Sequence, residues 1–317
     1  MKILQKVSAL LLFFTLIYCK NENSTVEFSK LTQDYFNDKN KLYPLEATVN
    51  GQNEYNNQLQ FEMTDGYRKK QVAFYKKYSQ QLQTVNYESL SEEEKNSFDI
   101  MKWEIDRGND LLKTSNNLLP IHQFWGTHLT MAQFAEGSSA QPFKTEKDYR
   151  DFLKRMELYT VWLDSAQVYM KKGITKGWVL PKALTQKLIP QFENFISTTT
   201  ENNIFYTTIH KFPENFTQAQ KQTLTKDYTK VIETKLVPQF HKMITFLKTE
   251  YLPASKTASG IGALPNGNKL YKVYIKQWTT TDLSPEEIHN LGLKEVARIK
   301  AEMEKVKQQV GYKEIGR

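Results

Sequence analysis

Apolar side chains recur every three or four residues along most of the chain, the spacing that places them on one face of an α-helix. One such segment begins at Ser91, where Ser91 and Glu94 form a capping box. In this motif each side chain accepts a hydrogen bond from the other residue's backbone N–H. The apolar face that follows comprises Phe98, Met101, Ile105 and Leu112. The pattern predicts an all-α protein.

A longer helix is expected to begin at Thr145, with Asp148 as its capping partner, and to end near Gly173. Its apolar positions also recur at helical spacing, and they are Tyr149, Phe152, Leu153, Met156, Leu163 and Met170. The segment from Gly173 to Pro181 is typical of a turn. Pro181 suits the first position of a short helix, and Pro190 is expected to end or kink that helix.

The pattern is helical again from Thr217 to about Leu252. Pro238 lies inside this run, so we expect a kink there or a break between two helices. Pro253 to Gly262 is expected to be a loop. Residues 271–279 are compatible with a minor short strand or with the start of another helix, and their pattern does not separate these two alternatives.

The last helix has the clearest start. Ser284 is the expected N-cap, Pro285 occupies the first helical position, and Glu287 completes a capping box. The apolar face comprises Ile288, Leu291, Val296, Ile299, Met303 and Val306. Such a face needs a partner, and the sequence stops soon afterwards at Arg317. We therefore expect the helical domain of residues 28–317 to be truncated at its C-terminus.

Residues 1–18 have the features of a signal peptide. A basic start is followed by an apolar stretch, from Val7 to Tyr18, that is too short to span a bilayer. The next residue is Cys19, and the arrangement resembles a bacterial lipoprotein signal in which this cysteine is lipidated. Tyr18 departs from that pattern, because a small residue is usual there. Residues 19–27 would form the lipidated tether; the alternative is an ordinary signal peptide with an incidental cysteine.

The charge pattern limits the choice of partners. The 317 residues carry a formal net charge of +8, but lysine and acidic residues are interspersed and no run of five basic residues occurs. This distribution is typical of a solvated helical surface, so no nucleic-acid partner is expected. Cys19 is the single cysteine, which excludes a disulfide within the chain. We expect a protein of the cell envelope whose lipid anchor binds the membrane on the periplasmic or cell-surface face.

No catalytic motif is found in the sequence. A zinc peptidase of the His-Glu-x-x-His type needs two histidines one helical turn apart and a glutamate, but none of the five histidines is followed by Glu. His122 and His128 are six residues apart, which does not place them on one helix face. There is no Gly-x-Ser-x-Gly elbow. Gly262 to Gly267 has the glycine spacing of a P-loop but lacks the following Lys and Ser or Thr in register. We therefore assign no catalytic residue and no metal ligand.

A glycine-rich turn and the residues after it are the remaining candidates for binding. The turn contains Gly260, Gly262, Pro265 and Gly267. Tyr271 and Tyr274 follow it and would bring phenol hydroxyls close to a bound peptide; the alternative is a tight turn packed on the core. His289 lies one turn into the last helix, where a neutral imidazole is favoured. It would contact a ligand or donate a hydrogen bond to a neighbouring loop.

These C-terminal motifs resemble the DUF885 family of bacterial secreted proteins and lipoproteins. The family's Gly-x-x-x-Leu-Pro-x-Gly turn corresponds to residues 260–267, its Thr-Thr-x-x-Leu-Ser/Thr-Pro-Glu-Glu-Ile-His segment to residues 280–289, and its Gly-Leu-x-Glu-Val-x-Arg-Ile segment to residues 292–299. Weaker matches are the turn from Gly173 to Pro181 and the Pro-x-x-Ala-Thr-x-x-Gly motif at residues 44–51. The resemblance covers nearly the whole mature chain but only the first half of a typical member.

The resemblance implies a function. The family is similar to helical zinc metallopeptidases, and its metal motif, His-Glu followed by Pro-Gly-His, lies in the second half. Zinc is therefore expected only for the full-length family, and this chain would be an inactive substrate-cleft half with Tyr271, Tyr274 and His289 as contacts for a peptide. The alternative is a standalone, non-catalytic envelope lipoprotein that binds a peptide or protein partner. An enzyme with unrecognised chemistry is a third possibility, with only scattered carboxylates and histidines to support it.

Overall fold

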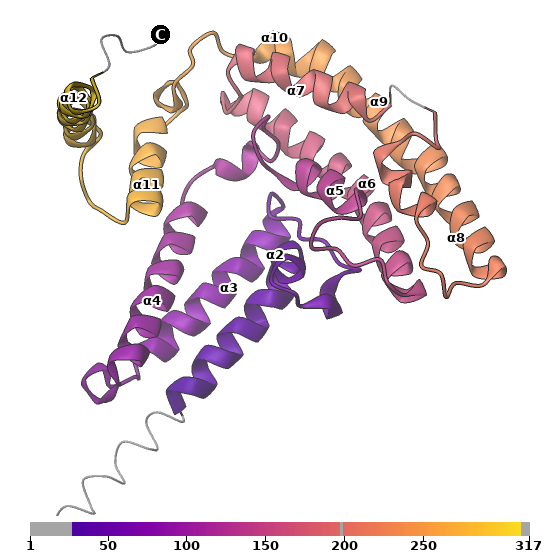
Figure 1. Ribbon diagram of the computed structural model, residues 1–317, viewed down its shortest axis with the longest axis horizontal. Coiled ribbons are helices and arrows are strands. Elements are labelled where there is room, and N and C mark those ends of the chain that lie inside the picture. Colours follow the sequence, from indigo (N-terminus) through magenta and orange to yellow (C-terminus); the bar gives the residue numbers. More distant parts are fainter. Residues whose placement is uncertain (1–26, 197–198, 312–317) are drawn as a thin grey trace, which may run out of the picture. The chain divides into compact units, whose positions relative to one another are not determined.

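The computed structural model describes residues 27–196 and 199–311, and this part of the chain is helical and contains no β-strand (Figure 1). The prediction of an all-α fold is therefore confirmed. The signal segment, Cys19 and the tether up to residue 26 lie outside the described residues. The chain divides into two compact units, of which the first ends at Pro265 and the second begins at Asn266.

The first unit starts with a helix of residues 27–42. The helices that follow in this unit are α2 (Pro44–Val49), α3 (Asp65–Leu82), α4 (Glu92–Leu112), α5 (Thr127–Ala135), α6 (Glu146–Lys176), α7 (Lys182–Asn194), α8 (Gln218–Val231), α9 (Val237–Phe246) and α10 (Leu252–Ala254). α3 packs against α4, while α8 and α9 pack against α6, the longest helix. The second unit contains α11 (Gly267–Thr279) and α12 (Pro285–Gln309).

Local capping sets the start of the long helices. Thr145 caps α6 and forms the predicted capping box with Asp148, and Ser91 does the same with Glu94 at α4. α6 continues one turn beyond the predicted end at Gly173 and stops where Gly177 adopts a left-handed φ of 70°. Gly173 itself lies inside the helix. Glycine is required there by packing, because a Cβ would approach the Trp178 carbonyl oxygen to 2.5 Å.

The prolines are accommodated inside helices. We expected Pro238 to kink or divide the run that starts at Thr217, and the structure divides it with a π-helical turn, Ile232–Leu236, instead of a loop. A second π-helical turn, Leu247–Tyr251, precedes Pro253. Proline cannot donate a backbone hydrogen bond, and its ring clashes with the carbonyl four residues earlier. The wider i→i+5 turn relieves both constraints, so helical packing continues past each proline.

Two further expectations about helix boundaries need correction. Pro190, which we expected to end or kink the helix, does not end it but lies inside α7, and Pro181 is the N-cap of that helix and not its first residue. The possible strand at residues 271–279 is wrong, because these residues belong to α11. Leu270 and Ile275 are buried and Tyr274 is half-buried, so the buried side follows a helical spacing.

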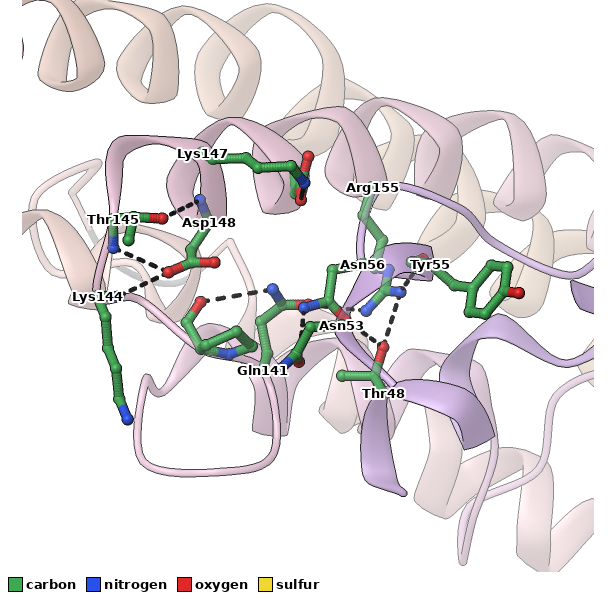
Figure 2. A network of polar contacts seen from close by, with 12 residues as sticks. Thr48, Asn53, Tyr55, Asn56, Gln141, Lys144, Thr145, Lys147, Asp148 and Arg155 are labelled. Atoms are coloured by element: carbon green, nitrogen blue, oxygen red, sulfur yellow. Dashed lines mark hydrogen bonds and ion pairs between the residues drawn. The ribbon is translucent and has the colours of Figure 1, made fainter. Parts of the chain in front are cut away.

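A buried arginine joins segments that lie far apart in the sequence (Figure 2). Arg155 of α6 is fully buried. Its Nε donates to the Gln58 carbonyl oxygen at 2.9 Å, and its Nη1 donates to Oε1 of Gln141 at 2.7 Å. Its Nη2 donates to Oγ1 of Thr48 at 2.9 Å and to the Tyr55 carbonyl oxygen at 2.7 Å. These four acceptors are uncharged, so the guanidinium is stabilised by hydrogen bonds rather than by a contacting carboxylate.

The Arg155 network explains part of the motif at residues 44–51. Thr48 accepts from Arg155 and donates to Oδ1 of Asn56 at 2.7 Å, and Ala47 is fully buried beside it. Burial lowers the pKa of Arg155 to about 9, with Asp151 acting in the opposite direction. The side chain is therefore still charged at neutral pH, and each of its donors must be satisfied inside the protein.

We expect Arg155→Ala to lower the free energy of unfolding by about 3–5 kcal/mol, because it leaves several buried acceptors without a donor. Arg155→Lys should recover only part of the loss, because one ammonium cannot reach acceptors spread across a planar fork. Urea denaturation followed by circular dichroism measures both. Arg150→Ala is the matched control: Arg150 lies on the same helix, half exposed, and pairs with Glu146. Equal effects at the two positions would contradict a structural role for the network.

Candidate functional site

A group of tyrosine and charged side chains in the first unit comes from the helix of residues 27–42, α2, the segment before α3, α3 and α4. Tyr35, Lys39 and Tyr43 are four residues apart on and just after the helix of residues 27–42, and Tyr67, Gln71 and Tyr75 have the same spacing on α3. Residues four apart share a helix face. We define the tyrosine–glutamate cluster as Tyr35, Lys39, Tyr43, Glu46, Glu62, Tyr67, Gln71, Tyr75 and Glu104.

One carboxylate of the cluster is fully paired. The Glu104 side chain of α4 accepts from the Tyr35 hydroxyl at 2.9 Å and from Nζ of Lys39 at 3.0 and 3.1 Å. Burial raises the pKa of Tyr35, and the charge of Glu104 and its hydrogen bond raise it further. Lys39 therefore neutralises Glu104, and the Tyr35 hydroxyl acts as a donor.

A second set of contacts joins the tyrosines. The hydroxyl oxygens of Tyr43 and Tyr75 lie 2.9 Å apart, and Nε2 of Gln71 donates to the Tyr43 hydroxyl at 3.0 Å. α4 passes close to the Tyr75 ring at Gly108, where a Cβ would lie 2.2 Å from the ring. Glycine at this position therefore allows α3 and α4 to pack closely enough to hold the tyrosines together.

Glu46 and Glu62 have a different environment, because neither forms an ion pair within the part of the chain that the structure describes. Burial raises the pKa of Glu62 to about 7, against the stabilising effect of its own backbone N–H and of the Gln60 side chain. The indole N–H of the fully buried Trp162 also lowers the pKa of Glu62, although it lies outside strict hydrogen-bond geometry. Burial also raises the pKa of Glu46, although its side chain remains exposed and Lys39 acts in the opposite direction.

The Tyr67 hydroxyl lies among these carboxylates. The oxygen is enclosed and has no hydrogen-bond partner within the described residues, although the side chain as a whole is half-buried. Burial raises the pKa of Tyr67, and the charges of Glu62 and Glu46 raise it further. An enclosed hydroxyl without a partner is costly unless water or a ligand satisfies it.

The three predicted cleft residues, Tyr271, Tyr274 and His289, all lie in the second unit. Tyr271 and Tyr274 lie on α11, with Tyr271 exposed and Tyr274 half-buried. His289 lies exposed in the first turns of α12. No hydrogen bond or ring contact joins His289 to either tyrosine within residues 266–311, so their role as a joint binding site stays a prediction.

Comparison with known proteins assigns the chain to a family. A family model described as "Bacterial protein of unknown function (DUF885)" matches residues 44–317. The chain belongs to the DUF885 family. A search of curated proteins gave no match. Among solved structures, "the putative lipoprotein from Colwellia psychrerythraea" is similar, with 21% sequence identity and a TM-score of 0.76. The match covers 92% of this chain and 52% of that protein, so the chain spans about half the length of that protein.

The glycine-rich turn of DUF885 proteins takes a defined shape in this chain. A short 3₁₀ helix, Ile261–Ala263, follows Gly260, and Asn266 adopts a left-handed φ of 56° directly before Gly267 begins α11. None of the three glycines from Gly260 to Gly267 has a left-handed φ. Pro265 packs against Gly177, since a Cβ at that glycine would lie 3.6 Å from the Pro265 ring. Pro265, the last residue of the first unit, therefore contacts the end of α6.

The zinc that the DUF885 resemblance implies does not fit the described residues. No group of three His, Cys, Asp or Glu side chains in this part of the chain could hold a metal ion. His128 is fully buried, stacks on Phe192 with ring centroids 5.4 Å apart, and contacts Oε1 of Gln191 at 3.3 Å. Burial lowers its pKa to about 4. His128 is thus a neutral packing residue.

The sequence alone does not reveal the tyrosine–glutamate cluster. A signal for it is present, since Tyr35, Lys39 and Tyr43 and then Tyr67, Gln71 and Tyr75 repeat one polar and aromatic spacing. The sequence does not show that these two helix faces pack against each other. Glu62 is also far from any motif, and its desolvation arises only from the packed structure.

We expect Glu62→Gln to change the pH dependence of stability. The folded pKa of about 7 lies above the ordinary value of 4.5, so the folded state holds a proton that the unfolded state loses. In the wild type the contribution of the protonated Glu62 to the free energy of unfolding is fully present below pH 4.5 and is lost as the pH rises through 7. Urea denaturation should show that the free energy of unfolding of the wild type falls by about 1–3 kcal/mol from pH 5 to pH 8, relative to that of the Glu62→Gln variant.

Glu88→Gln is the control for this comparison, because Glu88 is an exposed glutamate of the same unit. The buried His128 contributes to the pH dependence in the opposite direction, but it is present in every protein compared and cancels from the difference. The same pH dependence in the wild type and the Glu62→Gln variant would show that Glu62 is not desolvated.

Proposed function

We propose that this chain forms the helical, substrate-facing half of a hydrolase-like protein of the cell envelope, whose substrate is a peptide. The proposal assigns no catalytic residue to the chain itself. The second half of the family fold would supply the His-Glu and Pro-Gly-His residues that the full-length family is expected to use. Membership of DUF885 and the similar lipoprotein of about twice the length support this interpretation.

The observation that carries the proposal is the apolar face of α12. No residue of this helix is buried. Val296, Ile299, Met303, Val306 and Val310 are each about half exposed, and they recur in alternate steps of three and four residues. That spacing forms a seam for a second helix. Contiguous exposed apolar surface of this kind marks an interaction site.

The charges beside the seam indicate the kind of partner. Glu295 and Glu302 lie along one edge of the seam, and Lys300 and Lys307 lie along the other. A partner helix with an apolar stripe and oppositely ordered charges fits this surface. We propose that this partner is a helix from the remainder of the family fold, which would bury an apolar stripe of its own against the seam.

A second candidate is a standalone envelope lipoprotein that binds a peptide or protein partner without catalysis. The first unit supports it, because it has its own buried core and the Arg155 network. In both cases we propose a lipid on Cys19 as the membrane anchor. No helix among the described residues is long and apolar enough to cross a membrane.

We expect the full chain, purified in mild detergent with added zinc, to release no amino groups from a mixture of unstructured peptides. The reason is the lack of a three-ligand metal group within residues 27–196 and 199–311. Zinc-dependent cleavage would overturn the assignment of catalysis to a second half.

Sequencing the gene beyond the codon for Arg317 separates the two candidates: His-Glu and Pro-Gly-His codons would support the hydrolase, and unrelated sequence would favour the binding lipoprotein.

We expect Cys19→Ala to abolish lipid attachment and to release the protein from the membrane fraction. Labelling of growing cells with an alkyne-bearing fatty acid, followed by coupling to a dye, measures attachment directly. Tyr18→Ala is the companion variant, since it places a small residue before the cysteine and should increase processing. Labelling that persists in the Cys19→Ala protein would show that no lipid is carried at this position.

A further inference from the structure

α3 is the most basic helix that the structure describes. Five of its 18 residues are basic and one is acidic, which gives the helix a net charge of +4. The formal net charge of the whole chain is +8, so half of the excess lies on this one helix. α4, which packs against α3, carries seven acidic and three basic residues. The two packed helices therefore have opposite net charges.

The lysines of α3 lie on its exposed side. Lys69 and Lys76 are seven residues apart, about two helical turns, and Lys70 and Lys77 repeat this spacing. All four are exposed. Lys77 pairs with Asp38 at 2.7 Å, but none of the other three forms an ion pair within the described part of the chain. We define the basic face of α3 as these four lysines, and such a face attracts a negatively charged surface.

Contacts with the first helix tie α3 to the start of the chain. The Tyr35 ring of the helix of residues 27–42 packs on the rings of Phe74 and Tyr78, with centroids 5.2 and 5.0 Å apart. That helix begins eight residues after Cys19, and a segment of this length spans at most about 30 Å. The lipid that we propose at Cys19 would therefore hold α3 close to a bilayer.

Anionic lipid head groups match this face in charge. Each lysine close to an anionic bilayer strengthens binding by roughly fivefold. The attraction falls off within a Debye length, about 8 Å at physiological ionic strength, so it requires the proximity that an anchor supplies. Lysine stems can also lie along apolar surface while their ammonium groups stay in water, and Val72, which is 49% exposed on α3, offers such surface. The carboxylates of α4 would be repelled by the same head groups, which favours a single orientation.

We propose that the basic face of α3 docks the first unit on the anionic head groups of the membrane that holds its anchor. The four ammonium groups lie against lipid phosphates, and α4 is turned away from the bilayer. This inference rests on the proposed lipid at Cys19 only for the choice of a bilayer as the charged surface. It requires no peptide, no second half and no zinc. The fatty-acid labelling described above tests the anchor, whereas the dependence on head-group charge tests α3 alone.

The test is the rate of lysine acetylation, read by mass spectrometry, in the full chain anchored through its N-terminal segment in vesicles. One set of vesicles is phosphatidylcholine alone, and the other contains phosphatidylcholine and phosphatidylglycerol at about three to one. Flotation isolates the anchored chain before acetylation. The basic face should react at least about fivefold more slowly on the phosphatidylglycerol vesicles. The difference should disappear at about 1 M salt, where the Debye length is about 3 Å. Exposed lysines of the first unit outside α3 are the internal control and should react equally on both vesicles; they are Lys211, Lys226 and Lys230.

A pair of triple variants separates the position of the charge from its amount. In the variant with Gln at positions 69, 70 and 76, the remaining Lys77 should lose its protection on phosphatidylglycerol vesicles. The variant with Gln at positions 211, 226 and 230 removes the same charge elsewhere and should keep that protection. Circular dichroism melts verify that both variants fold. Equal acetylation of the basic face on both vesicles, or equal protection of the control lysines, would overturn the proposal. Protection by soluble polyglutamate but not by phosphatidylglycerol would also overturn it and assign the face to an acidic polypeptide.

Discussion

The fold depends on one buried charge. Arg155 lies in the middle of α6 and donates to groups that precede it by about a hundred residues, Gln58, Tyr55 and Thr48, as well as to the nearby Gln141. A guanidinium removed from water is stable only if its donors are satisfied. The segment of residues 44–58 must therefore adopt the conformation that presents its carbonyl oxygens to α6. This requirement holds α2 and the segment after it against α6.

The helices that pack on α6 continue past prolines that would normally interrupt a helix. Two π-helical turns precede Pro238 and Pro253, so that α8, α9 and α10 form one nearly continuous run. This run supplies buried aromatic residues such as Tyr228, Phe240 and Tyr251 to the core. The first unit is therefore stabilised largely by aromatic packing. α12, in contrast, has its apolar side chains exposed and contributes no buried residue to a core.

The tyrosine–glutamate cluster shows how an unusual polar environment arises from packing rather than from a motif. Glu104 is paired in the usual way with Lys39, whereas Glu62 is desolvated beside Trp162 and Tyr67. Close packing of α3 and α4 at Gly108 places the ring of Tyr75 within reach of Tyr43. Polar groups are thereby held partly out of water and partly without partners.

The sequence by itself determined the all-α class, the starts of α4, α6 and α12, and the family, because capping boxes and helical periodicity involve residues only three or four apart. Tertiary structure decided what depends on distant residues. Residues 271–279 form a helix, although their short pattern also suited a strand. Pro238 is accommodated by a preceding π-helical turn, which the local sequence does not predict. The partners of Arg155 and the desolvation of Glu62 likewise come from segments far apart in the chain, which only the packed fold brings together.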